Sequence, residues 1–463
     1  MKKVLAMVLV LCLCGSVLAG CGQTAAPASD AASAPAEQAK ETGTVNILCV
    51  STAIADIIAQ QVKDFEAETG IHVNCEVLEE SSAFEKLLTD LSSGSGTYDL
   101  FMTSPVYNWQ YIAGGWVEPL DAYIADPEKT EAEWDLDDFI PGILNAGRWT
   151  GEKLGGVGEG NLYCLPLMFE TYMLGYRPSV LAKYNMAVPT TYEELADCVS
   201  RLAAEPGLSD DNGMPMYPVV TRFDKYWDLT YLTFGTMLQS YGVTMVDENG
   251  NVAVNSPASI EATEIFVKMI QEGSPDGAGQ FTFYEAEQGF ASGQYVFSFN
   301  EADGFTAVYE DPEQSMISDD VGYAVTPLGP DGTRSASTWV WSMSMNSASR
   351  HKDEAWQVLK YLTSKDTMIK QHLLGSMEPV RQSAWEDEGV IALINGYGEY
   401  EGQYLEVVKT MGDCAELTLP AHPEITRALD VWATAVQSAY YGQSSVEDAL
   451  NAAAAEIADI LAN

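Results

Sequence analysis

The sequence predicts an α/β protein with two lobes. The chain has 463 residues, which is more than one hydrophobic core usually serves. A hydrophobic content of 47% and an aromatic content of 10% are sufficient for packed interiors. Early in the chain, a strand pattern, a helix pattern and a second strand pattern follow one another within about 35 residues, which is typical of a parallel βαβ unit.

The amino terminus has the layout of a secretory signal. Two lysines precede an apolar run at residues 4–13, which is too short to span a membrane as a mature helix. The run ends in Leu-Ala-Gly-Cys at residues 18–21, which resembles the cleavage box of bacterial lipoproteins. We therefore expect residues 1–20 to be a signal peptide and Cys21 to carry the acyl chains of a membrane anchor. The alternative is an ordinary secreted protein with an incidental cysteine.

Residues 21–43 are expected to be the lipidated cysteine and a disordered tether. Residues 22–43 lack large apolar side chains and are rich in Ala, Ser and Pro, so they cannot bury enough surface to fold. The tether would hold the folded body at the outer side of the cell membrane, facing the extracellular space or a periplasm.

Charge and cysteine content exclude several classes of function. The formal net charge of −44 repels nucleic acid and offers no basic patch for phosphates, so we expect no nucleic-acid binding. Five cysteines would remain in the mature chain, without C-x-x-C spacing, which argues against a disulfide framework or a zinc site. We expect neither a metal nor a cofactor.

The βαβ unit supplies the first candidate contacts. Residues 45–51 read as a strand, residues 55–70 as a helix ending at Gly70, and residues 71–78 as the next strand. Ligands in parallel sheets lie beyond the carboxyl ends of the strands, which makes Ser51 and Glu80 candidate ligand contacts. Ordinary loop polarity is the alternative for both.

The stretch at residues 162–178 organises the rest of the chain. It is an apolar strand pattern that contains one carboxylate, Glu170, among apolar and aromatic side chains. An acid in such surroundings must find hydrogen bonds or face a cleft. A helix follows, for which Thr190 with Glu193, or Thr191 with Glu194, fits a capping box.

This order of features resembles the carbohydrate-binding proteins of bacterial ABC importers. The resemblance rests on a glycine-rich hairpin before the strand, Val-Pro-Thr-Thr-Tyr-Glu-Glu-Leu at residues 188–195 and Gly-Trp-Val-Glu-Pro-Leu-Asp at residues 115–121. It implies a two-lobe periplasmic-binding-protein-like fold of type II, similar to maltose-binding protein, with three interlobe crossings. Lobe I would comprise residues 44–168 plus 327–377, and lobe II residues 169–326 plus 378–463.

The residues themselves and the resemblance together give the remaining site predictions. An arginine beside aromatic rings suits hydroxyl hydrogen bonding and stacking, which points to Arg222 and Trp227, although a surface Arg-Asp pair with a core tryptophan would look the same. The family's cleft-facing segments add Ser104, Tyr107, Asn300, Glu301, Trp339 and Arg381. Related sugar and polyol binders often carry an acid at the place of Asn300.

The resemblance implies a receptor rather than an enzyme. A sugar or sugar alcohol would be captured between two closing lobes and delivered to the permease subunits of an ABC transporter, with the protein acting as a monomer. Closure requires a ligand that contacts both lobes, because only differential affinity shifts that equilibrium.

Two alternatives remain open. A polyamine or other cationic solute could occupy a cage of acids and aromatic rings, although Arg222 and Arg381 count against it. A secreted glycoside-active enzyme would need two carboxylates, such as Glu170 and Glu301, about 5 to 9.5 Å apart. We find none of the common hydrolase, zinc or nucleotide-binding motifs.

Overall fold

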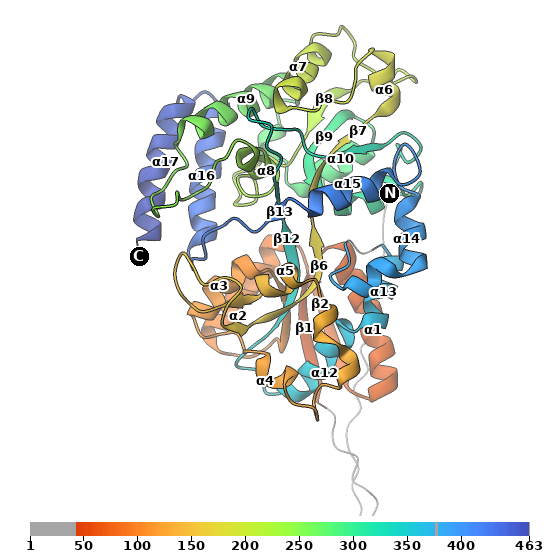
Figure 1. Cartoon of the computed structure of the whole chain (residues 1–463), viewed down its shortest axis with the longest axis vertical. Coiled ribbons are helices and arrows are strands. Elements are labelled where there is room, and N and C mark those ends of the chain that lie inside the picture. Colours follow the sequence, from red (N-terminus) through yellow and green to blue (C-terminus); the bar gives the residue numbers. More distant parts are fainter. Residues whose placement is uncertain (1–42, 376–377, 463) are drawn as a thin grey trace, which may run out of the picture. The chain divides into compact units, whose positions relative to one another are not determined.

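The computed structural model describes residues 43–375 and 378–462, which belong to one compact unit. The predicted signal peptide, Cys21 and the tether lie outside the described residues, as do Ser376 and Met377 of the expected third crossing. The described chain contains two main sheets, each covered by helices (Figure 1).

The sheet of lobe I has the order β2-β1-β3-β12-β6. The strands β1 and β2 are parallel and are joined by α1, as the βαβ pattern predicts, and Gly70 ends α1 with a φ of 75°. The strand β12 runs antiparallel to both β3 and β6. The bounds are β1 (Thr44–Val50), α1 (Ala53–Thr69), β2 (His72–Leu78), α2 (Glu80–Ser93), β3 (Leu100–Thr103), α3 (Pro105–Ala113), β6 (Cys164–Glu170), β12 (Trp339–Met345), α12 (Lys352–Leu362) and α13 (Lys365–Leu373).

The sheet of lobe II has the order β10-β7-β9-β8. The strand β7 is antiparallel to β10 and β9, whereas β8 is parallel to β9. The bounds are β7 (Tyr172–Tyr176), α6 (Pro178–Lys183), α7 (Tyr192–Ala203), β8 (Tyr217–Val220), α8 (Thr233–Ser240), α9 (Pro257–Gly273), α10 (Phe283–Ala291), β9 (Tyr295–Ala302), α11 (Thr306–Tyr309), β10 (Gly322–Ala324), α14 (Glu388–Asn395), α15 (Gln403–Gly412), α16 (Ile425–Tyr440) and α17 (Val446–Leu461).

Short elements complete the described chain. They are α4 (Asp121–Ile124), α5 (Pro141–Ala146), β4 (Arg148–Trp149), β5 (Asn161–Leu162), β11 (Ala336–Ser337), β13 (Ala415–Glu416) and the 3₁₀ turns η1 (Ala132–Trp134), η2 (Leu136–Asp138), η3 (Ala278–Gln280), η4 (Asp303–Phe305) and η5 (Gln382–Glu386).

The chain passes between the sheets at defined places. At the first, β6 of lobe I continues into β7 of lobe II through the single residue Thr171. At the second, β11 packs on α8 and pairs with β13, so the chain joins the sheet of lobe I only at Trp339. Both crossing strands of lobe I, β6 and β12, are hydrogen-bonded neighbours, and they therefore bring their ends to the same place (Figure 1).

The predicted cap of α7 is present in a modified form. Thr191 is the N-cap and its Oγ1 accepts a hydrogen bond from Glu194 N at 3.1 Å. The Glu194 carboxylate returns to Thr190 N at 2.8 Å rather than to the N-cap residue. Both threonines of the Thr-Thr pair therefore stabilise the start of the helix.

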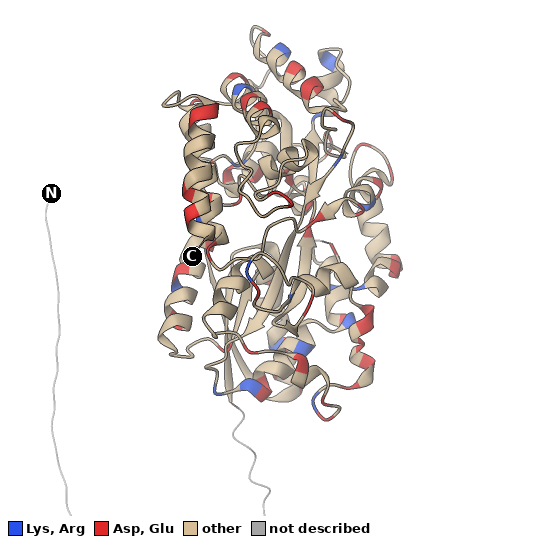
Figure 2. Ribbon diagram, turned by 60° about the vertical axis from the view of Figure 1, so that its left-hand side comes forward, with Lys and Arg blue, Asp and Glu red and all other residues tan. Residues whose placement is uncertain are grey.

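Two further features bear on function. In the ribbon of Figure 2, acidic residues are spread over many helices and loops of both lobes and basic residues are fewer, as the net charge predicts. Among the described residues, no helix combines the length and apolar character that crossing a bilayer requires.

Candidate ligand-binding cavity

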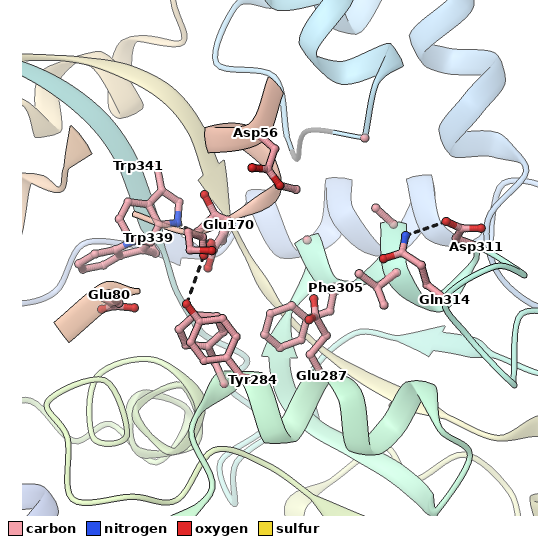
Figure 3. A pocket seen from close by; sticks show the side chains of 18 of the residues that line it. Asp56, Glu80, Glu170, Tyr284, Glu287, Phe305, Asp311, Gln314, Trp339 and Trp341 are labelled. Atoms are coloured by element: carbon pink, nitrogen blue, oxygen red, sulfur yellow. Dashed lines mark hydrogen bonds between the residues drawn. The ribbon is translucent and has the colours of Figure 1, made fainter. Parts of the chain in front are cut away.

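A cavity of about 520 Å³ is lined by residues of both lobes. Lobe I contributes the carboxyl end of β1, the start of α1, the first residue of α2 and the adjacent ends of β6 and β12 (Figure 3). Its lining residues are Ser51, Thr52, Ala53, Asp56, Glu80, Glu170, Trp339, Trp341, Leu373, Leu374 and Gly375. Those that lobe II supplies are Arg222, Trp227, Asp228, Leu232, Phe283, Tyr284, Glu287, Gly304, Phe305, Ala307, Val308, Asp311, Gln314, Leu393 and Tyr397.

Three tryptophans form an aromatic wall of the cavity. Trp339 and Trp341 lie two residues apart on β12, so both point to the same side of the strand, and both line the cavity. The Trp339 ring lies 4.7 Å from that of Trp227, centroid to centroid, at an interplanar angle of 32°. Trp341 meets Trp339 edge-on at 5.5 Å. Indole rings brought from both lobes therefore meet at one place.

Tyr107 packs against two of the tryptophan rings of this wall. Its ring stacks on Phe84 and meets Trp227 and Trp339 edge-on at 5.7 and 6.2 Å. Its hydroxyl is 3.1 Å from that of Tyr226. Tyr107 is absent from the lining of the cavity and instead fixes the orientation of the rings that line it.

Glu170 ends β6 at the floor of the cavity. It lies opposite Trp339 in the β6–β12 register. Its carboxylate accepts hydrogen bonds from Trp341 Nε1 at 2.9 Å and from the Tyr172 hydroxyl at 3.2 Å. Burial raises the pKa of Glu170 to about 7, although the Arg222 charge and these two donors oppose the rise. The acid that the sequence placed among aromatic groups is thus both hydrogen-bonded and at the cavity.

Arg222 lines the cavity with its charge already paired. Its Nε and one terminal nitrogen donate to Glu301 Oε2 at 3.0 and 2.7 Å, and its other terminal nitrogen donates to Asp228 at 2.9 Å. Glu301 also accepts from the Arg222 backbone nitrogen and from Thr221 Oγ1. Glu301 therefore lies behind the arginine and holds it, and it does not itself line the cavity.

Glu80 differs from the buried acids Glu170 and Asp228 in that its carboxyl has no hydrogen-bond partner among the described residues. The neighbouring Glu79 caps α2 by accepting from Ser81 N and Ser82 N, whereas the Glu80 carboxyl receives no hydrogen bond from the described residues. Glu80 is only 8% exposed. Burial, followed by the nearby charge of Asp228, raises the pKa of Glu80 to about 8.

Three predicted residues lie elsewhere in the structure. Ser104 caps α3 through Val106 N, and Asn300 on β9 donates to Tyr192 and to Thr233 O inside lobe II. The Arg381 guanidinium donates to the backbone oxygens of Thr363, Trp134 and Asp135, pairs with Asp138 and stacks 4.0 Å from Phe139. Its side chain is fully buried in this packing, so it does not reach the cavity.

Several lining residues were not among the sequence predictions. Asp228 follows Trp227 directly and pairs with Arg222, but it lies in an irregular segment where spacing gives no signal of that pairing. Phe283 and Tyr284 begin α10, where only tertiary packing turns them toward the cavity. The Tyr284 hydroxyl donates to Ser51 O at 3.2 Å and so connects lobe II to lobe I (Figure 3).

The described residues offer no obvious metal centre. No group of three or more His, Cys, Asp or Glu in the described part of the chain is arranged to hold an ion. The groups available in the cavity to hold a ligand are therefore aromatic rings, carboxyl groups and the guanidinium of Arg222.

Comparison with known proteins agrees with this architecture. Residues 51–369 match the family model described as bacterial extracellular solute-binding protein. The chain is 26% identical over 407 residues to the erythritol/L-threitol-binding protein of Mycolicibacterium smegmatis, covering 87% of this chain and 83% of that protein.

Solved structures share the fold. A solute-binding protein of an ABC transporter from Agrobacterium radiobacter K84, in complex with ribitol, superposes with a TM-score of 0.78 at 22% identity, covering 90% of this chain and 98% of that one. A maltose-bound protein of T. maritima gives a TM-score of 0.76 at 22% identity, with 90% and 100% coverage. These likenesses confirm the predicted α/β fold of type II.

Proposed function

Because the chain belongs to the family of bacterial extracellular solute-binding proteins, we propose that it captures a sugar or sugar alcohol in the cavity between its lobes. The family consists of receptors rather than enzymes. One relative in this family is named for binding erythritol and L-threitol, and a structural neighbour holds ribitol. These ligands share a dense set of hydroxyl groups and an apolar C–H surface.

The observation that carries the proposal is the composition of the cavity wall. Indole faces of Trp339, Trp341 and Trp227 can stack on the C–H face of a sugar or polyol. Carboxylates can accept hydrogen bonds from hydroxyl groups, and Arg222 can donate to them. Charge-assisted hydrogen bonds of this kind contribute about 1.5 to 3 kcal/mol each.

Of the residues that the sequence singled out, we propose a ligand-contacting set that lines the cavity. The set consists of Ser51, Glu80, Glu170, Arg222, Trp227 and Trp339. Lobe I contributes four of these residues and lobe II contributes Arg222 and Trp227. A ligand that touches all of them bridges the lobes and therefore favours the closed arrangement.

A panel of ligands tests this function. Thermal unfolding of the purified chain is recorded with mono- and oligosaccharides, with four- to six-carbon polyols and with spermidine. We expect at least one sugar or polyol to raise the melting temperature in a concentration-dependent way, because a ligand that binds only the folded state stabilises it. Stabilisation by spermidine alone would contradict the proposal.

The arrangement of the two carboxylates does not favour glycoside hydrolysis. Glu301 is enclosed behind Arg222 and does not line the cavity, so it cannot meet a substrate beside Glu170. The expected result is that the protein releases no nitrophenol from aryl glycosides.

We also propose how the receptor is held and used. Acylation of Cys21 would anchor it at the outer face of the cell membrane through the segment at residues 21–43. The closed, ligand-bound monomer would dock on the permease subunits of an ABC transporter. The predicted lobes, residues 44–168 plus 327–377 and residues 169–326 plus 378–463, would move as the two bodies of this closure, with Glu170 moving with lobe I because β6 extends to it.

A further inference from the structure

The cavity contains many more acids than cations. Its carboxyl groups are those of Asp56, Glu80, Glu170, Asp228, Glu287 and Asp311. Within the described part of the chain, the one basic side chain in the lining is Arg222. A site built only for neutral hydroxyl groups has no need of so large an excess of negative charge.

Arg222 cannot balance this charge. Its guanidinium is 2.7 Å from Glu301 and 2.9 Å from Asp228, and all three side chains are buried. One cation therefore already serves two carboxylates. Glu170 is satisfied by two neutral donors, Trp341 and Tyr172. Burial and the Asp228 charge raise the pKa of Glu80 by more than the Arg222 charge lowers it.

Two carboxyl groups at the cavity, those of Glu80 and Asp228, have oxygens that receive no hydrogen bond from the described residues. The Glu80 side chain is more than nine-tenths buried and receives no hydrogen bond from the described residues. Asp228 Oδ1 is likewise without a partner in the described structure, although Oδ2 of the same group pairs with Arg222. A buried acid without a partner costs free energy, because it has lost its water and gained nothing in return.

Aromatic rings lie beside these acids. Trp227 precedes Asp228 in the chain, its ring packs on that of Trp339, and both rings line the same cavity as Glu80 (Figure 3). The face of an indole ring attracts cations. An ammonium group could donate hydrogen bonds to these carboxyl groups while the indole faces attract its charge.

We propose that the sugar or sugar alcohol captured here carries a protonated amine, which Glu80 and Asp228 hold against the indole faces of Trp227 and Trp339. This inference rests on the proposed function and narrows its ligand class. An ammonium group has three donors and a full positive charge, so it can donate to both carboxyl groups and offset the excess of acid. A neutral hydroxyl can donate to one carboxylate but brings no charge to offset the others.

Binding of such a ligand would be coupled to proton release. Because burial and the Asp228 charge raise the pKa of Glu80 to about 8, this carboxyl is mostly protonated in the empty cavity at pH 7. An ammonium group beside it favours the ionised form, so the proton leaves as the amine binds. A neutral polyol brings no charge and gives no such release.

Matched probe pairs test this inference. Isothermal titration calorimetry on the purified full chain compares glucosamine with glucose, galactosamine with galactose, and 1-amino-1-deoxysorbitol with sorbitol. The titrations are run at pH 7 in two buffers that differ in ionisation enthalpy. For at least one pair we expect the amine to bind at least about tenfold more tightly and to release a proton that its neutral partner does not.

Two variants assign the effect to Glu80. Glu80→Gln should reduce or abolish both the preference for the amine and the proton release. Glu79→Gln is the matched control, since Glu79 is the adjacent exposed acid and does not line the cavity. It should retain both effects.

The outcomes separate this inference from the proposed function. Binding of neutral sugars or polyols without any preference for their amines would overturn the inference and leave the proposed function in place. A preference that persists unchanged in Glu80→Gln would also overturn it. Failure of every sugar, polyol and amine in the calorimetric and thermal-unfolding panels to bind, or stabilisation by spermidine alone, would overturn both.

Discussion

Single residues at the cavity set its response to pH. Burial raises the pKa of Glu80 to about 8 and that of Glu170 to about 7, whereas the ordinary pKa of a glutamate is 4.5. The folded protein therefore binds more protons than the unfolded chain between about pH 4.5 and pH 8. The stability that these two groups contribute is fully present at low pH and is lost as the pH rises through 7 and 8.

This leads to a prediction for the ligand-free protein. We expect the contribution of Glu80 to the melting temperature to fall between pH 5.5 and pH 8.5, so Glu80→Gln, which cannot ionise, should show a smaller fall than the wild type. Differential scanning calorimetry at matched ionic strength measures the difference. Equal pH profiles for the two proteins would show that Glu80 does not titrate as described.

Trp339 is the residue on which ligand stacking depends most. Trp339→Leu keeps apolar bulk but removes the indole face, so we expect the dissociation constant for a bound sugar or polyol to rise at least about tenfold, or roughly 1.4 kcal/mol. Trp356→Leu is the control, because Trp356 is also a buried tryptophan of lobe I but contacts Tyr123 and Trp134 far from the lining. Both variants should lose stability, whereas only the first should lose affinity; calorimetric titration distinguishes them.

Among the elements, β6 of lobe I and β7 of lobe II are joined through the single residue Thr171, which is hydrogen-bonded on both its backbone and its side chain. Thr171 N and Oγ1 donate to Asp303 Oδ2 at 3.1 and 2.6 Å, and Asp303 N donates to Thr171 O at 3.0 Å. Both side chains are completely buried. Asp303, which follows β9, is therefore held against Thr171 at the crossing between β6 and β7.

Thr171→Val tests this link. The change keeps the shape of the side chain but removes the donor to a buried carboxyl, which costs about 1 to 3 kcal/mol of the free energy of unfolding. Thr171→Ser retains the hydroxyl and should lose much less. Urea unfolding of the ligand-free protein measures both, and equal midpoints for valine and threonine would contradict the role given to this hydrogen bond.

Elements with local periodicity were predictable from the sequence, and elements that depend on distant pairing were not. The unit β1–α1–β2 was readable because its pattern changes from strand to helix and back within a short segment. The insertion of β12 between β3 and β6 pairs Trp339 with Glu170, residues far apart in the chain, and no local pattern contains it. Family resemblance pointed to Trp339 at the cleft, but the pairing of its strand with β6 was not predicted.

The same distinction explains which residues of the candidate site could be predicted from the sequence. Glu170 and Trp339 lie on strands that end at the cavity, so their positions followed from the crossings. The orientations of the Asn300 and Arg381 side chains depend on their hydrogen-bond partners, which the sequence does not reveal. Both side chains hydrogen-bond within packed interiors. Asp228 and Tyr284 reach the cavity from irregular or helix-start positions, which periodicity does not describe.

In the whole molecule, we propose that the two-lobed receptor is attached to the membrane through an acylated Cys21. Cys21→Ala removes the thiol that the lipoprotein box would acylate. In bacterial cells expressing the chain we expect the wild type to partition into detergent-rich phases with the membrane, and the variant to be recovered in the aqueous phase. Identical partitioning of the two proteins would contradict acylation at Cys21.

The central claim is that one ligand lies between the lobes and contacts both. A crystal structure of the protein with the sugar or polyol that stabilises it most tests this claim directly. We predict a single bound ligand stacked on Trp339 and within hydrogen-bond distance of Glu170 and Arg222. Density for the ligand on another surface, with the space between Trp339 and Arg222 unchanged, would contradict the account.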